Sequence, residues 1–259
     1  MEIGTAKPSP EDRIQIKHFF INNISITDDY NVGKFEAEAV ALLEELFKTR
    51  RLVILTGGSG LYLDAVAGTL DDIPKVDPSI REGLMESYKK HGIEALSDRL
   101  KLLDPVYHAR ADLRNPHRVV RALEVCLGTG KPFSSFRNQK KKERPFRILK
   151  IALERDRQEL YERIEARMDQ MIAEGLFEEA RNLYPWRALN ALQTVGYQEI
   201  FDYIDQKYDY QEAVRLLKRN SRRYAKRQMT WLRKDPDYHW FHPSQHPEIV
   251  ELIENYMAE

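Results

Sequence analysis

The spacing of apolar residues along the chain predicts an α/β protein. From Phe35 to Thr49, apolar side chains recur at helical spacing. Leu52–Thr56 is a short continuous apolar run, which is typical of a buried parallel strand. Gly57–Gly60 then makes a tight turn, and helical periodicity resumes at Leu61. A helix, a strand, a glycine turn and a helix in this order favour a layered α/β core.

The periodicity changes after the first third of the chain. It is helical throughout from Pro78 to about Lys131, and Arg147–Leu153 returns to the alternation of a strand. The rest of the chain is again mostly helical. We therefore predict an α/β fold with a parallel-sheet core and an inserted all-helical domain. The predicted boundaries are 1–76 for part of the α/β core, 77–140 for the inserted helical domain and 141–259 for the rest of the core, mostly helical.

The composition excludes several classes of protein. Basic and acidic residues balance at 41 each in 259 residues, and the single Cys126 excludes a disulfide framework or a cysteine-based metal site. His239, His242 and His246 match no zinc motif, so we expect no metal ligands there. No segment approaches the ~20 apolar residues of a membrane span, and the N-terminus has no apolar signal region. We expect no membrane association and a cytoplasmic location.

One segment departs from this balance of charge. Between Ala213 and Lys234 there are nine Lys or Arg residues and no acidic residue. Those at helical spacing on one face are Arg215, Arg219, Arg222 and Lys226. Such a cationic stripe indicates a polyanionic partner. The alternative is a solvated helix face, although solvated faces normally mix the two signs.

Three further features each have a functional and a structural interpretation. The Gly57–Gly60 turn could let backbone N–H groups approach a phosphate, or could need glycine for its conformation alone. Arg114–Arg118 could contact phosphate or form surface ion pairs. Arg163 and Arg167 lie one helical turn apart, so they could clamp a diphosphate or pair with the neighbouring glutamates.

Several of these features also form an ordered set of motifs. The set comprises Gly4–Pro8, Thr56–Tyr62, Asn115–Glu124, Gln193–Glu199 and Lys226–Arg233. In order and spacing it resembles the bacterial tRNA dimethylallyltransferases over essentially the whole chain. The resemblance implies a P-loop NTPase-like core with an inserted helical tRNA-binding domain. It also implies transfer of a dimethylallyl group from dimethylallyl diphosphate, with Mg²⁺ on the diphosphate, to the exocyclic amine of the adenosine 3′-adjacent to the anticodon, giving isopentenyladenosine.

The resemblance also implies partners and residue roles. The partners would be dimethylallyl diphosphate and a tRNA anticodon stem-loop whose target base is flipped out, and the enzyme would be a monomer. Ser59, near the flipped nucleotide, and Arg167, near the diphosphate, would be catalytic. The implied tRNA-binding residues are Gly57, Gly58, Ser59, Arg81, Arg114, Asn115, Pro116, His117, Arg118, Gln193, Thr194, Val195, Gly196, Tyr197, Gln198, Lys226, Arg227, Gln228, Met229, Thr230, Trp231, Leu232 and Arg233.

The sequence departs from the family at its start. The family begins with a strand, a GPTxxGKT phosphate loop and an aspartate that acts as general base, and neither the loop nor the aspartate occurs here. We therefore expect an N-terminally truncated core and no activity in the chain as it stands. Two alternatives remain: a non-catalytic tRNA-binding protein on the same scaffold, and an adenine-nucleotide isopentenyltransferase. The helical domain and the cationic stripe argue against the second.

Overall fold

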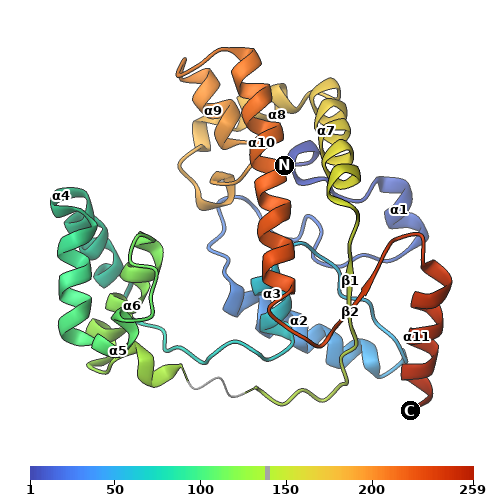
Figure 1. Cartoon of the computed structure of the whole chain (residues 1–259), viewed down its shortest axis with the longest axis horizontal. Helices are drawn as coiled ribbons and strands as arrows, with labels where there is room; N and C mark the ends of the chain where they lie inside the picture. Colours follow the sequence, from blue (N-terminus) through green and yellow to red (C-terminus); the bar gives the residue numbers. More distant parts are fainter. Residues whose placement is uncertain (138–140) are drawn as a thin grey trace. The chain divides into compact units, whose positions relative to one another are not determined.

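The computed structural model describes residues 1–137 and 141–259, and within them the protein is mostly helical (Figure 1). The chain divides into two compact units. Unit 1 consists of Met1–Glu38, Arg50–Gly60 and Arg147–Glu259, and unit 2 consists of Ala39–Thr49 and Leu61–Phe146. Helices α2 (Val32–Phe47) and α3 (Gly60–Val66) begin in unit 1 and continue into unit 2. Helix α2 confirms the helix predicted from Phe35, and it starts slightly earlier.

Unit 2 is built on the packing of α4 (Pro78–Leu103) against α6 (Pro116–Thr129). Gly92 divides α4 into two helical segments, because its φ of 79° is left-handed backbone that glycine adopts without strain. The described part of 77–140 contains helices and no strand, as the periodicity predicts. The buried core residues are Leu84, Leu96, Leu100, Val119, Val120, Ala122, Leu123, Val125, Cys126 and Phe133.

A fully buried carboxylate holds one end of unit 2 together. Asp104 caps α5 (Pro105–His108) by accepting a hydrogen bond of 2.9 Å from the Tyr107 amide. The same carboxylate accepts bonds of 2.6 Å and 2.8 Å from the amide and hydroxyl of Ser134, in η2 (Phe133–Phe136). These three donors offset the cost of taking the carboxylate out of water.

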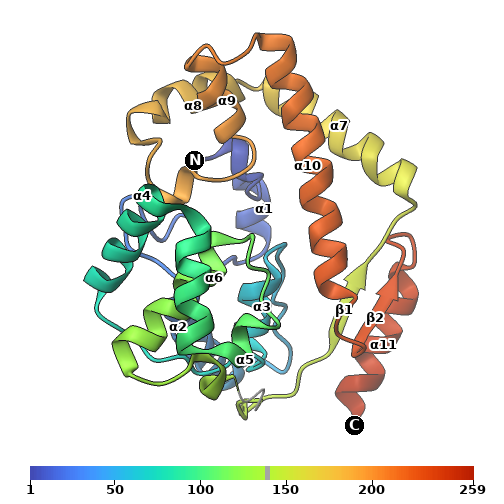
Figure 2. The ribbon, with the colours of Figure 1, turned by 60° about the vertical axis from the view of Figure 1, so that its left-hand side comes forward.

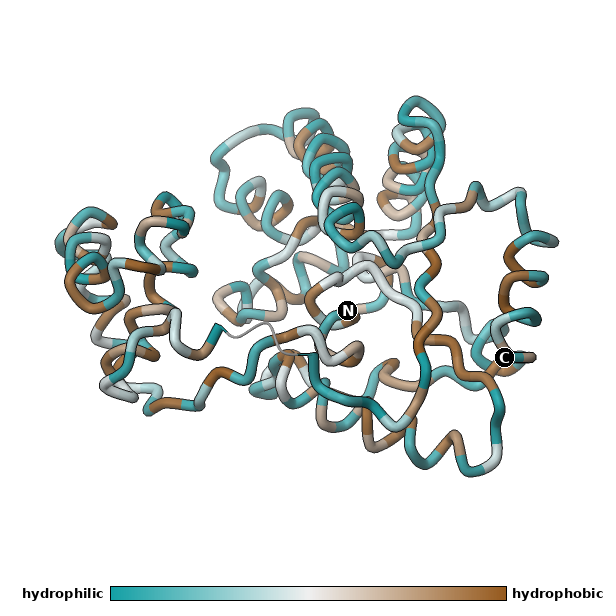
Figure 3. Tube along the Cα trace, turned by 60° about the horizontal axis from the view of Figure 1, so that its bottom comes forward, coloured by the Kyte–Doolittle hydropathy of each residue, from teal (hydrophilic) through white to brown (hydrophobic). Residues whose placement is uncertain are grey.

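Unit 1 contains four helices around a second core: α7 (Arg157–Ala173), α8 (Leu176–Leu183), α9 (Gln198–Ile204) and α10 (Tyr210–Leu232) (Figure 2). Helix α10 packs against both α7 and α9. Figure 3 shows apolar and polar residues alternating along the helices, as amphipathic helices require. The buried core residues are Met168, Met171, Leu176, Ala180, Leu192, Tyr197, Ile200, Phe201 and Leu217.

A two-stranded parallel sheet and several short elements complete unit 1. Strand β1 (Lys150–Leu153) pairs in parallel with β2 (Tyr238–Phe241), and α11 (His246–Ala258) comes after it. Strand β1 confirms the second half of the strand predicted over Arg147–Leu153. The shorter elements are η1 (Ile3–Thr5), α1 (Pro10–Gln15), η3 (Tyr184–Trp186) and η4 (Asn190–Leu192).

The predicted strand Leu52–Thr56 is wrong within the described structure. The segment is irregular, and Leu52, Ile54 and Leu55 are exposed rather than buried. A parallel strand is stable only when neighbouring strands satisfy its backbone groups. Among the described residues the only sheet is the β1–β2 pair, so this segment has no strand to pair with. The structure therefore shows a helix-rich α/β fold with a small sheet, and a larger P-loop-like sheet is not confirmed.

Candidate nucleic-acid interface and transfer site

The glycine turn before α3 lies directly against the C-terminal half of α10, within unit 1. Gln228 donates a hydrogen bond of 2.8 Å from Nε2 to the carbonyl oxygen of Gly58. A Cβ atom on Gly58 would overlap the Gln228 amide, and one on Gly60 would overlap the indole of Trp231. Close packing against a rigid ring requires glycine at position 60, whereas a side chain at position 58 would displace the Gln228 amide and break its hydrogen bond to the turn. The structure brings together two segments that the sequence indicates only separately.

The turn is accessible as well as closely packed. Gly57, Gly58 and Ser59 are exposed, and a Cβ on Gly57 would meet no other atom within 4 Å. Backbone groups at Gly57 and the Ser59 hydroxyl can therefore be reached by a ligand. The role predicted for Ser59 stays a prediction, because its side chain has no described partner that would define one.

Ion pairs neutralise four of the cations on α10 and at its C-terminal end. Arg222 pairs with Glu165 and Lys218 pairs with Asp169, both on α7. Arg215 pairs with Glu212, and Arg233 pairs with Glu154 at 3.2 Å. These four cations are therefore neutralised, and two members of the predicted stripe, Arg215 and Arg222, face acids contributed by the fold.

Four cations of α10 have no carboxylate partner among the described residues. Arg219 is half-buried and donates a hydrogen bond of 3.1 Å from Nε to Asn220 Oδ1, and the other three form a group of exposed cations. In the part of the chain that the structure describes, Arg223, Lys226 and Arg227 have no carboxylate within ion-pair distance, and all three are exposed. Each lies within two turns of Gln228, which holds the glycine turn. The positive field of α10 is therefore concentrated in its C-terminal half, next to the turn.

The Gln193–Gln198 segment shows a mixture of exposed and buried residues. Gln193, Thr194 and Gln198 are exposed, and the side-chain amide of Gln198 donates to Gln193 Oε1 at 2.7 Å. Gly196 has a φ of 104°, which glycine alone adopts easily. Its amide donates a hydrogen bond of 2.9 Å to the carboxylate of the buried Glu199. The segment is therefore a rigid turn that presents amide side chains to solvent.

Tyr197 is buried in this segment, as is Gly196 before it. The Tyr197 side chain is fully buried and is not accessible to a ligand in this structure, so the tRNA contact implied for it stays a prediction. Its hydroxyl donates a hydrogen bond of 2.6 Å to Glu179 on α8. Burial and this carboxylate raise the pKa of the Tyr197 hydroxyl well above its ordinary value. The residue serves the core of unit 1.

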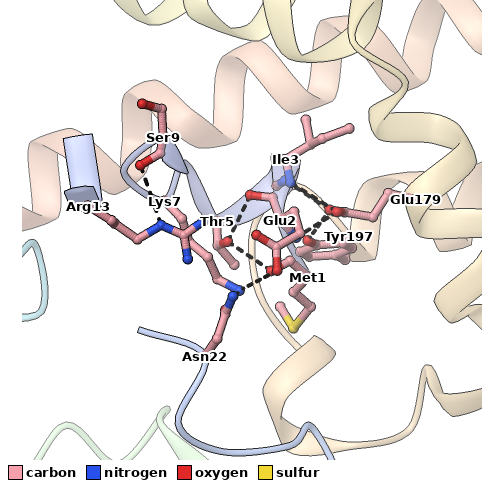
Figure 4. Close-up of polar contacts among 11 residues, drawn as sticks. Met1, Glu2, Ile3, Thr5, Lys7, Ser9, Arg13, Asn22, Glu179 and Tyr197 are labelled. Carbon is pink, nitrogen blue, oxygen red and sulfur yellow. Dashed lines mark hydrogen bonds and ion pairs between the residues drawn. The ribbon is translucent and has the colours of Figure 1, made fainter. Parts of the chain in front are cut away.

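Glu179 also holds the Gly4–Pro8 motif in place (Figure 4). Its carboxylate accepts hydrogen bonds from the amides of Glu2, Ile3 and Gly4 at 2.6, 2.9 and 3.0 Å. A Cβ on Gly4 would come within 2.6 Å of the Tyr197 ring, so this position also excludes a side chain. The sequence gives no signal for the role of Glu179, because this residue lies in an ordinary run of acidic residues on a helix.

In unit 2, the Arg114–Arg118 segment begins α6. Asn115 is its N-cap, accepting from the His117 and Arg118 amides at 3.1 and 3.4 Å, and Pro116 occupies the first turn. The side chains of Arg114, His117 and Arg118 are exposed. This cap explains the local motif, and it leaves both arginine side chains accessible to an anion.

The two other predicted arginines differ from one another. Arg81 pairs at 3.3 Å with the buried Glu124, which also pairs with Arg121. Arg167 is exposed on α7, and no described contact joins it to the glycine turn. Its assignment to the diphosphate therefore stays a prediction, and so does the tRNA contact of Arg81.

Two features are absent from the part of the chain that the structure describes. The described residues include no group of three or more His, Cys, Asp or Glu side chains that could hold a metal ion. They also include no helix that is both long enough and apolar enough to span a membrane.

Comparison with known proteins defines the class. The model of the family described as IPP transferase matches residues 1–235. The chain therefore belongs to the IPP transferase family, and it is an enzyme of the prenyltransferase class.

Particular relatives agree with this assignment. The chain is 50% identical to tRNA dimethylallyltransferase 1 of Bacteroides fragilis, over 98% of this chain and 84% of that protein. It is also 50% identical to the tRNA dimethylallyltransferase of Christiangramia forsetii, over 98% and 85% of the two chains. These matches cover nearly the whole chain. They do not confirm that a phosphate-binding unit is missing, and they do not support the expectation of inactivity.

Solved structures show the same fold. The tRNA isopentenylpyrophosphate transferase of Bacillus halodurans matches with a TM-score of 0.69 and 36% identity, over 99% of this chain and 83% of that one. A eukaryotic dimethylallyltransferase acting on tRNA matches with a TM-score of 0.76 over 94% of this chain and 65% of that one. At 23% identity, the second likeness supports the fold alone.

Proposed function

We propose that this chain transfers a dimethylallyl group from dimethylallyl diphosphate to the exocyclic amine of the adenosine 3′-adjacent to the anticodon of tRNA. The observation that supports this most strongly is the packing of the glycine turn against α10, in which Gly58 contacts Gln228 and Gly60 contacts Trp231. It places an accessible turn beside unneutralised cations. An enzyme that modifies a base edge needs both a pocket for the flipped base and a surface for the RNA backbone.

The proposed reaction is a substitution at the allylic carbon. The amine nitrogen of adenosine forms the new N–C bond, the C–O bond to diphosphate breaks, and the nitrogen loses one proton. Diphosphate leaves with the electron pair of the broken bond. The residues of the turn would position the acceptor, and Arg167 would contact the leaving diphosphate.

We also propose that Mg²⁺ accompanies the diphosphate. A magnesium ion on a diphosphate usually takes one or two protein carboxylates in addition to the phosphate oxygens. The described residues form no cluster of acidic or histidine side chains suited to this, so no step of the reaction is assigned to the metal. We further propose that the enzyme is monomeric and acts in the cytoplasm.

A transfer assay tests the function. Dimethylallyl diphosphate labelled in its prenyl group would be incubated with the chain, Mg²⁺ and unmodified tRNA, and label in the tRNA would be counted. Two matched acceptors serve as controls: the same tRNA with guanosine at the target position, and adenosine monophosphate. We expect label only in the tRNA that carries the target adenosine.

The other outcomes favour the alternatives. Label on adenosine monophosphate would indicate a nucleotide prenyltransferase. RNA binding without label would indicate a non-catalytic tRNA-binding protein. If the chain does not bind the tRNA and incorporates no label, the proposed function is contradicted.

A further inference from the structure

Two large aromatic side chains are exposed along the second half of α10. Tyr224 is 41% exposed and Trp231 is 37% exposed. They are seven residues apart, so they share one face of the helix and are separated by about 10 Å along its axis. The indole of Trp231 is anchored against Gly60. Tyr224 lies one turn before Gln228, and none of the motifs identified in the sequence includes it.

The aromatic rings are accompanied by cations. The Arg227 guanidinium lies 5.6 Å from the centre of the Tyr224 ring, and the Lys234 ammonium lies 5.3 Å from the centre of the Trp231 ring. Arg223 precedes Tyr224 directly and is exposed. Neither Arg223 nor Arg227 has a carboxylate partner among the described residues. The surface therefore combines open rings with positive charge.

A tyrosine elsewhere in unit 1 makes a different arrangement with its cations. The ring of Tyr161 on α7 lies between Arg157 and Arg222, at 5.2 and 5.7 Å. Arg222 is neutralised by Glu165, and Tyr161 is partly buried. That arrangement is an internal contact between two helices. The arrangement at Tyr224 leaves the ring and its cation open to a ligand.

Exposed rings interleaved with free cations suit unpaired nucleotides, because bases stack on aromatic faces while arginine contacts the phosphates. A fully paired duplex offers no free base faces, and an acidic peptide has no comparable planar groups. We propose that Tyr224 is a base-stacking residue for an unpaired nucleotide of the RNA substrate, and that Arg223 and Arg227 contact the adjacent phosphates. The inference rests on the proposed function and extends it to a residue outside the glycine turn.

The test compares variants of Tyr224 on two RNAs. The probes are a fluorescently labelled RNA hairpin with the sequence of an anticodon stem-loop, and a blunt RNA duplex of equal length without unpaired bases. Tyr224→Ala removes the ring, and Tyr224→Phe keeps it. Tyr210→Ala is the matched control, because Tyr210 lies on the same helix and is 46% exposed.

We expect Tyr224→Ala to raise the Kd for the hairpin about tenfold. The slope of log K against log salt should not change, because no phosphate contact is lost. Tyr224→Phe and Tyr210→Ala should stay within about twofold of the unaltered protein, and no variant should weaken duplex binding. Melting temperatures would confirm that all variants are folded.

Three results would overturn the inference: an unchanged Kd for Tyr224→Ala, an equal loss on the duplex, or an equal loss in Tyr224→Phe. If the unaltered protein binds the hairpin and only the Tyr224 effect is absent, the inference fails while the proposed function stands. If the unaltered protein binds neither RNA, both fail together.

Discussion

Replacing Glu179 with glutamine should destabilise the protein by far more than an ordinary helix substitution. The carboxylate accepts four hydrogen bonds, two at each oxygen, from the three amides of Glu2–Gly4 and from the Tyr197 hydroxyl. Glutamine keeps one acceptor oxygen and turns the other position into an NH₂ group that faces two donors. Two charge-assisted bonds are then lost, and the donors are left unpaired.

The magnitude can be worked from these bonds. Hydrogen bonds to a charged group contribute about 1.5–3 kcal/mol each, and the partial exposure of Glu179 reduces this, so a loss of about 2–4 kcal/mol is expected. At this chain length 1 kcal/mol corresponds to about 2–4 °C, which gives a fall in Tm of about 5–15 °C. The control is Glu178→Gln, since Glu178 pairs only with exposed Arg181, at 2.8 Å, and such pairs contribute about 0–1 kcal/mol.

The pH dependence of this difference gives a second check. Burial would raise the pKa of Glu179, but hydrogen bonds from Tyr197 and from the amides of Gly4, Glu2 and Ile3 outweigh it and lower the pKa. A lowered pKa contributes stability above the unfolded-state value near 4.5, and this stability is lost as the pH falls through the folded value. The gap in Tm between Glu179→Gln and the unaltered protein should therefore narrow below about pH 4. Equal Tm values for the Glu178 and Glu179 variants at pH 7 would refute the reasoning.

The remaining predictions concern the glycine turn, the second unit and the RNA surface. Gly60→Ala should lower Tm and RNA affinity, because the new methyl group overlaps the rigid indole of Trp231. The control Gly57→Ala places its methyl group in open space and should keep the Tm of the unaltered protein. Equal Tm values for the two variants would contradict this prediction. Asp104→Asn should lower the free energy of unfolding, measured in urea, by about 1–3 kcal/mol, because the new side-chain amide faces the buried donors of Ser134. A smaller loss would show that the site rearranges. Combined Arg118→Glu and Lys226→Glu should weaken tRNA binding and reduce the salt slope by roughly one per lost phosphate contact, and an unchanged slope would make both residues ordinary surface cations.

Local signals in the sequence predicted the elements that depend on neighbouring residues. Helical periodicity predicted α2, α4, α6 and α10, and Asn115-Pro116 is an N-terminal helix signal that the structure shows in use. The strand predicted at Leu52–Thr56 was wrong. The segment has the amino-acid composition of a strand, but strand formation depends on partner strands elsewhere in the chain. Glu179 could not be found for the same reason, since three of its four donors lie more than 170 residues away in the sequence.

The sequence predicts the separate segments of the candidate site but does not show that they lie together in the fold. The Gly57–Ser59 turn and the Lys226–Arg233 segment were each identified from the sequence, but only the structure shows that Gln228 binds the turn. In the same way, Tyr197 belongs to a motif that resemblance assigned to tRNA contact, and its burial shows that it serves the core. A sequence motif therefore does not distinguish residues that contact a ligand from residues that stabilise the fold.

The charge of α10 shows why counting cations overstates an interface. Nine Lys or Arg residues without an acid between Ala213 and Lys234 suggest a continuous cationic stripe. The structure neutralises four of them with carboxylates, and those on α7 come from about 50 residues away in the sequence. What is left for a polyanion is concentrated in the C-terminal half of the helix, beside the glycine turn and between exposed rings. Long-range ion pairs therefore decide where a basic helix can bind, and they favour the end of α10 that lies next to the proposed site of transfer.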